Sequence, residues 1–168
     1  GETTTEWKAE DQVVCGDAMP ECSGTFGINM DYRGIFLNMS FYYQFGGQTY
    51  NQTLVDRVEN ANVGLNVDKR IYNAVWKKPG DRVDFSYNPY RLTKPSSRFV
   101  QDLNELRLSS LNVGYDFRHC AFLKKSRLQQ LKASFYMDDV FRASTVKTER
   151  GLTYPFARTF SFSLQATF

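Results

Sequence analysis

The sequence has 168 residues, with 21 basic and 18 acidic side chains, and its net charge at neutral pH is +3. This balance does not indicate a nucleic-acid-binding protein or one held at an anionic membrane surface, since both need an excess of positive charge. No run of 18 apolar residues and no signal peptide occurs, so we expect no transmembrane helix, and we expect any export signal to lie upstream.

Residues 1–23 are polar and rich in turn-forming residues, and we expect a loop or linker there. Cys15 and Cys22 flank six turn-rich residues and could close a small surface disulfide in an oxidising compartment. The alternative is three free thiols, because Cys120 has no partner by sequence spacing. Neither alternative implies catalysis.

Residues 24–33 and 35–45 show the two-residue periodicity of β-strands. Alternate positions are apolar and share one face: Phe26, Ile28, Met30, Tyr32, Ile35, Leu37, Met39, Phe41, Tyr43 and Phe45. The two segments meet at Arg33-Gly34, where the glycine suits a tight turn. The sequence therefore predicts a β-hairpin.

Residues 46–104 form a long irregular segment, and loops of this size usually have a function or carry structure of their own. Asp68 can cap a short helix that Pro79-Gly80 would end. In that helix Tyr72 and Trp76 would lie four residues apart, on one side.

Basic and aromatic side chains alternate irregularly between Lys69 and Lys78. Such a mixture could stack bases and neutralise phosphates. The favoured interpretation is a loop helix with its aromatic side chains packed and its lysines in water.

Three further segments alternate in the same way, at residues 106–117, 129–138 and 158–168. The last is the clearest, with Phe160, Phe162, Leu164, Ala166 and Phe168 on one face and hydroxyl or amide side chains on the other. A tilted strand of about 9–11 residues crosses a bilayer with its apolar face towards lipid. The same pattern also fits a half-buried strand of a soluble β-sandwich.

The lengths of the connections, together with an aromatic content of 15%, favour the membrane barrel. The connections are short at Arg33-Gly34, very long at 46–104, moderate at 118–128 and longer at 142–156. Outer-membrane barrels have short periplasmic turns, long extracellular loops and aromatic girdles. We therefore expect the long loops and residues 1–23 to be extracellular, and the C-terminus to be periplasmic.

The predicted fold is all-β, with antiparallel up-and-down strands in a segment spanning residues 24–168. Five strands cannot close a membrane barrel, which starts at about eight strands. We therefore expect the chain to be the C-terminal segment of a larger transmembrane β-barrel.

Several motifs that follow one another along the chain carry a family resemblance. They are Gly16-Asp17 with Pro20, Trp76-Lys77-Lys78-Pro79-Gly80-Asp81, Ser96-Ser97-Arg98-Phe99-Val100, Leu106-Arg107-Leu108, Gly114-Tyr115, Asp139-Val140-Phe141, Glu149-Arg150-Gly151 and Tyr154-Pro155-Phe156-Ala157-Arg158-Thr159-Phe160. With these motifs the chain strongly resembles the C-terminal end of SusC/RagA-type TonB-linked outer membrane proteins of Bacteroidetes. Asp139-Val140 departs from the Asn-Leu that the family tends to show there, which leaves the ligand preference open.

The resemblance implies a plugged barrel of about 22 strands that imports glycan or peptide fragments through the outer membrane. A SusD-like lipoprotein would cover it outside, TonB would drive it, and lipid would surround it. Tyr72 and Trp76 then become candidates for ligand contact. Phe160, Phe162, Leu164 and Phe168 resemble the C-terminal signal that the barrel-insertion machinery reads.

No signature of an enzyme or of a cofactor site is found. His119 is the single histidine and has no second ligand at zinc-site spacing. Asp138 and Asp139 adjoin on a strand and would point to opposite faces. The alternatives to an importer are a soluble all-β module that binds carbohydrate or protein, and a structural surface protein.

Overall fold

The computed structural model describes residues 6, 8–62, 64–86, 92–121, 123, 128–147 and 157–168. These residues form two compact units. The sheet unit comprises the described parts of 20–46, 103–145 and 156–168, and the loop unit comprises those of 1–19, 47–102 and 146–155. Of the motifs quoted above, Glu149-Arg150-Gly151 and Tyr154-Pro155-Phe156 lie outside the described residues.

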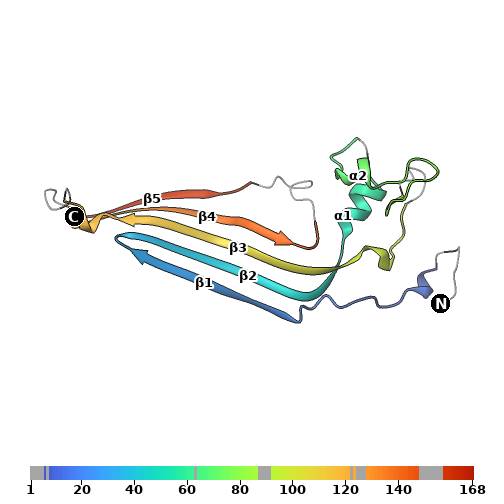
Figure 1. Ribbon diagram of the computed structural model, residues 1–168, viewed down its shortest axis with the longest axis horizontal. Helices are drawn as coiled ribbons and strands as arrows, with labels where there is room; N and C mark the ends of the chain where they lie inside the picture. Colours follow the sequence, from blue (N-terminus) through green and yellow to red (C-terminus); the bar gives the residue numbers. More distant parts are fainter. Residues whose placement is uncertain are drawn as a thin grey trace. The chain divides into compact units, whose positions relative to one another are not determined.

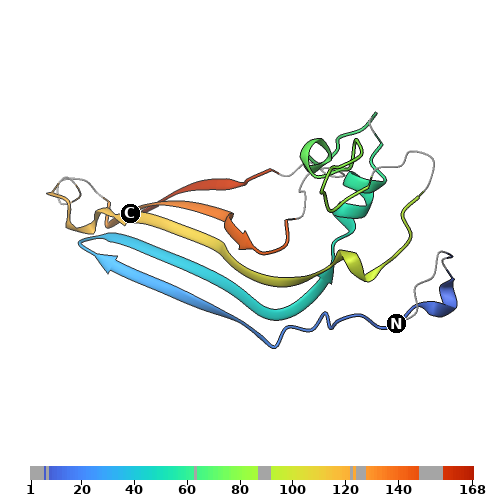
Figure 2. The ribbon, with the colours of Figure 1, turned by 45° about the vertical axis from the view of Figure 1, so that its right-hand side comes forward.

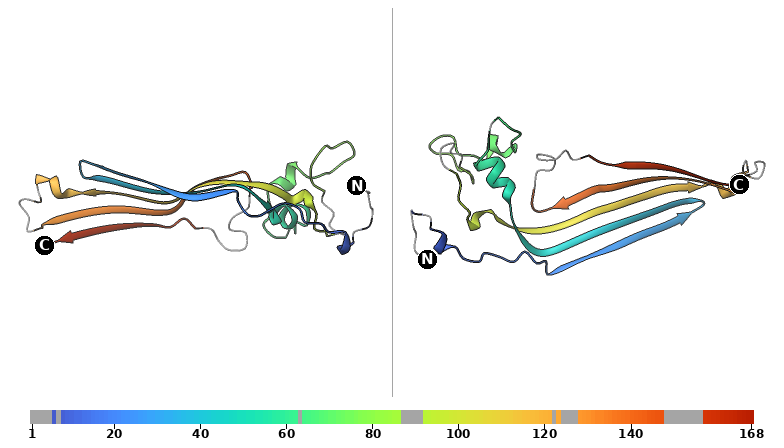
Figure 3. Two further views of the ribbon diagram at one scale, coloured as in Figure 1. Left: turned by 90° about the horizontal axis from the view of Figure 1, so that it is seen from below. Right: turned by 180° about the vertical axis from the view of Figure 1, so that it is seen from behind.

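The sheet unit is a five-stranded sheet in which each strand lies beside its neighbours in sequence (Figure 1, Figure 2). The strands are β1 (Cys22–Tyr32), β2 (Ile35–Tyr50), β3 (Val100–Asp116), β4 (Gln130–Ser144) and β5 (Phe160–Thr167). Seen from below, the sheet is twisted, as strands of L-residues normally are (Figure 3). The predicted antiparallel, up-and-down, all-β fold is confirmed, and the sheet of this chain is not closed into a barrel.

The predicted hairpin is formed by β1 and β2. Arg33 and Gly34 have φ values of 49° and 91°, and two successive positive φ angles give a turn whose twist matches that of the strands. A Cβ at Gly34 would meet the carbonyl oxygen of Asp116 at 2.7 Å. Glycine is therefore needed both for the turn and for the close approach of β3.

The pairing register gathers the apolar side chains on one face of the sheet. Residues directly opposite one another in antiparallel strands share a face. On the apolar face the opposed pairs include Phe26–Phe41, Ile28–Met39, Leu111–Met137, Val113–Phe135, Phe135–Phe162 and Ala133–Leu164. On the other face they include Asn29–Asn38, Gly114–Ser134, Lys132–Gln165 and Ser134–Ser163. The sheet is thus apolar on one side and polar on the other.

The side chain of Phe36 is only 7% exposed although it belongs to the polar face. Its ring lies against Gly114, where an added Cβ would come within 2.3 Å of the ring and within 2.3 Å of the Ala133 carbonyl oxygen. The Lys132 ammonium lies 4.1 Å from the ring centroid. Phe36 therefore joins β2, β3 and β4 across the polar face.

Three strands are longer than predicted. β2 continues to Tyr50, five residues beyond the predicted end at 45, β3 begins at Val100 and β4 continues to Ser144. The segment between β2 and β3 is therefore 51–99, and the predicted loop boundaries of 46 and 104 were wrong. The extensions lie where apolar alternation is lost, so periodicity alone could not reveal them.

A β-bulge explains one of these missed boundaries. The register shifts between Leu108 and Ser110, so that two residues of β4 stand against one of β3. Asp139, in the bulge, has a φ of 48°. The bulge changes which residues of β4 share a face, while pairing with β3 continues on both sides of it.

The loop unit contains short helical turns around a small apolar core. The turns are η1 (Ala9–Asp11), α1 (Gln52–Leu54), the π-helical η2 (Val55–Glu59), α2 (Arg70–Asn73) and η3 (Ser97–Phe99), while η4 (Phe117–His119) follows β3 in the sheet unit. The buried core residues are Leu54, Val55, Val58, Val75 and Phe99. Among the described residues, no helix combines the length and the apolar character needed to span a membrane.

The helix predicted from Asp68 is shorter than expected. The Asp68 carboxylate accepts the backbone N–H of Arg70 at 2.8 Å, but α2 already ends at Asn73. Val75 then forms a parallel bridge with Phe85 and enters the core. The helix therefore ends before Val75, and the predicted end at Pro79-Gly80 was wrong.

An ion pair between a buried carboxylate and a partly exposed arginine joins distant parts of the segment between β2 and β3. Glu59, 1% exposed, accepts Arg98 Nη2 on both carboxylate oxygens, at 2.7 and 2.8 Å. The same carboxylate accepts the Thr93 hydroxyl at 2.8 Å and the Ser86 N–H at 3.2 Å. This network satisfies the buried charge and fixes η2 against residues 93–98.

Candidate functional site

The apolar face of the sheet is uncovered by the rest of the described chain. Phe26, Met30, Phe160, Phe162 and Leu164 are all exposed on it. Apolar side chains gathered on one continuous surface indicate contact with lipid or with another protein surface. This face is the first candidate functional surface.

The four residues proposed for barrel assembly lie at one edge of the sheet. Phe160, Phe162 and Leu164 occupy alternate positions of β5, the last strand in the sheet order, and Phe168 follows the end of β5. All four are exposed. The structure thus brings them onto one strand face, and their role as an assembly signal stays a prediction.

The polar face has a cavity of about 450 Å³ beside the β1–β2 turn. Its lining includes Asp31, Asn38, Asp116, Arg118, His119 and Lys132. Asp116 accepts the Arg118 N–H at 3.0 Å and its guanidinium at 2.9 Å. His119, which was predicted only as a turn residue, therefore lines a charged depression. Within the described residues, no group of three metal-ligating side chains occurs.

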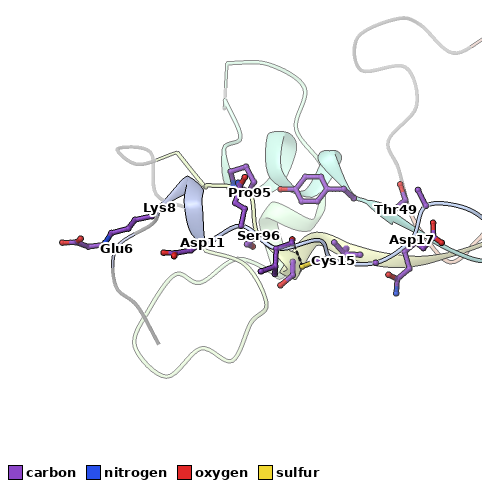
Figure 4. Close-up of a pocket in the computed structure, with 16 residues that line it drawn as sticks. Glu6, Lys8, Asp11, Cys15, Asp17, Thr49, Pro95 and Ser96 are labelled. Carbon is purple, nitrogen blue, oxygen red and sulfur yellow. Dashed lines mark hydrogen bonds between the residues drawn. The ribbon is translucent and has the colours of Figure 1, made fainter. Parts of the chain in front are cut away.

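The loop unit has a larger cavity of about 670 Å³ (Figure 4). One wall is the extended stretch containing Val13, Cys15 and Asp17, and the other comes from the end of β2 and from residues 95–100. Pro95, Ser96 and the ring of Tyr50 contribute apolar surface and hydroxyl groups. Such a mixture could hold a polar organic ligand.

Tyr50 and Gly16 shape this cavity. Burial raises the pKa of the Tyr50 hydroxyl above its ordinary value, aided by the Asp56 and Glu59 carboxylates. The phenol is neutral at physiological pH, as tyrosine ordinarily is, and it can donate a hydrogen bond. Gly16 has a φ of 83° and lies so close to Gln48 that a Cβ would reach 2.0 Å from its Oε1.

The two predicted ligand-binding aromatics lie elsewhere in the loop unit. Tyr72, in α2, and Trp76 are both exposed, and neither lines the cavity. Because α2 ends between them, they are not neighbours on one helical face. Their role in ligand binding stays a prediction. Tyr50 and Ser96, which do line the cavity, were not predicted as site residues, because sequence periodicity does not distinguish them.

All three cysteines are free thiols in this structure. Cys15 and Cys22 are exposed and Cys120 is half-buried. Of the two alternatives predicted from the sequence, the structure agrees with three free thiols. The disulfide between Cys15 and Cys22 is not formed in it.

Comparison with known proteins finds one relative by sequence and several solved structures with the same fold. No protein-family model matches the chain. TonB-dependent receptor P3 of Formosa agariphila is 26% identical over 184 residues, and the alignment covers 97% of this chain and 18% of that protein. The chain thus spans less than a fifth of the length of this curated relative.

Solved structures of the RagAB peptide importer have the same fold. In its open-open state the match has a TM-score of 0.72 and 17% identity, and covers 99% of this chain and 19% of the matched one. In its closed-closed state the TM-score is 0.70, with 16% identity and coverage of 98% and 19%. These matches extend over both the sheet and the loop residues. The chain is therefore similar in sequence to part of a TonB-dependent receptor, and it has the fold of part of the RagAB importer.

Proposed function

We propose that this chain forms part of the wall of an outer-membrane importer, with its apolar face towards lipid and its polar face towards the lumen. The observation that carries the proposal is the apolar face to which all five strands contribute. In a membrane barrel lipid covers such a face, whereas a soluble sandwich would need a second sheet. The likeness to a TonB-dependent receptor and to RagAB supports the same function.

The proposed orientation of the chain in the membrane follows from the lengths of the connections between strands. The two-residue turn at Arg33-Gly34 would be periplasmic, together with the C-terminus, and residues 1–23 and 51–99 would be extracellular. The extracellular segments would contact a SusD-like lipoprotein and the cargo, a glycan or peptide fragment, with Tyr72 and Trp76 as candidate contacts. TonB would act on parts of the protein outside this chain.

Fractionation and uptake by cells carrying the full-length parent gene test this function. We expect the product in the detergent-soluble outer-membrane fraction, and we expect deletion of the gene to abolish growth on one class of oligosaccharide or peptide. Recovery of the product in the soluble fraction would contradict the proposal. It would support the alternative of a soluble all-β binding module.

Lysine substitutions on the two faces of β5 test which face meets lipid. Replacing Phe162, 72% exposed on the apolar face, by lysine should lower the free energy of unfolding by about 2–4 kcal/mol if the side chain lies near the bilayer midplane. Ser163→Lys, on the polar face, should have a much smaller effect. Denaturant unfolding of the full-length protein in lipid vesicles measures both.

Equal losses from the two substitutions would contradict the assignment of the faces. The comparison is matched because the two residues are adjacent on one strand and lie opposite Phe135 and Ser134. Strand propensity and depth in the membrane are therefore nearly the same at both positions.

A further inference from the structure

Two arginines stand directly opposite each other on neighbouring strands. Arg107 of β3 pairs with Arg142 of β4 in the register. Like charges in opposed positions destabilise a sheet. A single carboxylate, Glu105, lies with them: Arg142 Nη2 donates to its Oε2 at 2.6 Å, and Arg107 Nε is 3.9 Å from its Oε1.

This group of three side chains carries unbalanced charge. Two guanidinium groups face one carboxylate that is only 6% exposed, so one positive charge in the group is not compensated. The Nε atoms of both arginines are buried and have no hydrogen-bond partner among the described residues. The side chains themselves remain accessible, at 40% for Arg107 and 28% for Arg142.

An aromatic ring orients the more exposed arginine. The guanidinium carbon of Arg107 lies 5.2 Å from the centroid of the Tyr42 ring. The Tyr42 hydroxyl donates to Gln44 at 2.7 Å, which fixes the ring. Tyr42 stands opposite Thr25 on the polar face of the sheet, so the arginines lie over that same face.

We propose that Arg107 and Arg142 bind a carboxylate carried by the imported cargo. The inference rests on the proposed function, because it places the polar face in the import path. A guanidinium held in a fixed plane can donate two parallel hydrogen bonds to an oxyanion, and it loses little conformational entropy in doing so. The bound anion would balance the charge that Glu105 leaves unmatched.

The test compares charged and neutral forms of one ligand on the detergent-purified full-length protein with its partner lipoprotein. Two matched probe pairs cover both cargo classes: oligogalacturonate against its methyl ester, and a glutamate-rich peptide against its glutamine counterpart. We expect one charged probe to bind about tenfold or more tightly than its neutral form. The preference should shrink as salt is raised.

Arg107→Gln and Arg142→Gln should each reduce that preference, and the double variant should abolish it. Arg33→Gln is the matched control, because Arg33 also belongs to the sheet unit and its guanidinium carbon also lies over an aromatic ring, 5.3 Å from the centroid of Tyr32. It should leave the preference unchanged. Heat-dependent gel mobility of each variant verifies that the barrel is folded.

Two results would overturn the inference. One is the absence of a preference for either charged probe in the unmodified protein. The other is a preference for a charged probe that persists in the folded double variant. If that variant also loses stability, the arginines pair with an acidic group elsewhere in the protein and not with the cargo. Growth on neutral cargo together with no charge preference would refute this inference alone, whereas a product outside the outer membrane would refute the proposed function.

Discussion

Replacing Gly114 by alanine in the full-length protein is expected to impair assembly and to lower the stability of the molecules that do fold. The added Cβ would lie 2.3 Å from both the Phe36 ring and the Ala133 carbonyl oxygen. A ring can turn away, but a backbone oxygen paired across β3 and β4 cannot move without disturbing the ladder. Overpacking of this kind costs about 1–3 kcal/mol and occasionally more, and we expect the upper part of that range.

Gly27→Ala is the control for this substitution. Gly27 also lies in a strand, on β1, but a Cβ there would meet only the Met39 carbonyl oxygen, at 3.4 Å. We expect it to have little effect or to stabilise slightly. Heat-dependent gel mobility measures the folded fraction, and denaturant unfolding in vesicles measures the free energy of unfolding. Equal results for the two alanine variants would show that the packing of the Phe36 ring does not require glycine at position 114.

Replacing Arg98 by methionine should loosen the loop unit without affecting the sheet. It would leave the Glu59 carboxylate, 1% exposed, without its counter-charge. Removing one partner of a buried pair costs about 3–5 kcal/mol, and we expect the lower end because the Arg98 side chain is 47% exposed. Hydrogen exchange of the amides in 52–60 and 93–99 measures this local stability.

Two further variants make this result interpretable. Glu59→Gln combined with Arg98→Met removes the buried charge as well, so protection should recover in part. Gln52→Ala removes an exposed hydrogen bond to Asp56 in the same unit, and it should change little. Unchanged exchange in Arg98→Met would show that the apolar core alone holds the loop unit.

Gly114→Ala and Arg98→Met should affect different functions, because the first lies in the sheet unit and the second in the loop unit. A Gly114 variant should reduce the amount of protein in the outer membrane, because the sheet itself is affected. An Arg98 variant should reach the membrane in normal amounts and lose cargo binding, if the loop unit contributes to binding as proposed.

The presence of five strands, their order along the chain and the apolar face of each could be predicted from the amino-acid sequence, whereas the extensions of three of them could not. Alternation of apolar and polar residues is a local property of the chain, so it can be read without knowing the fold. The pattern from Phe160 to Phe168 is the clearest example. The Arg33-Gly34 turn was likewise determined locally, by the need for positive φ angles.

The features that join distant residues could be seen only in the folded chain. Glu59 and Arg98 are 39 residues apart, and no sequence period relates them. The burial of Phe36 depends on a missing side chain at Gly114, and the opposition of Arg107 and Arg142 depends on a register shifted by the bulge at Asp139. Periodicity fixes which way a side chain points, whereas strand register and chain folding fix what it meets.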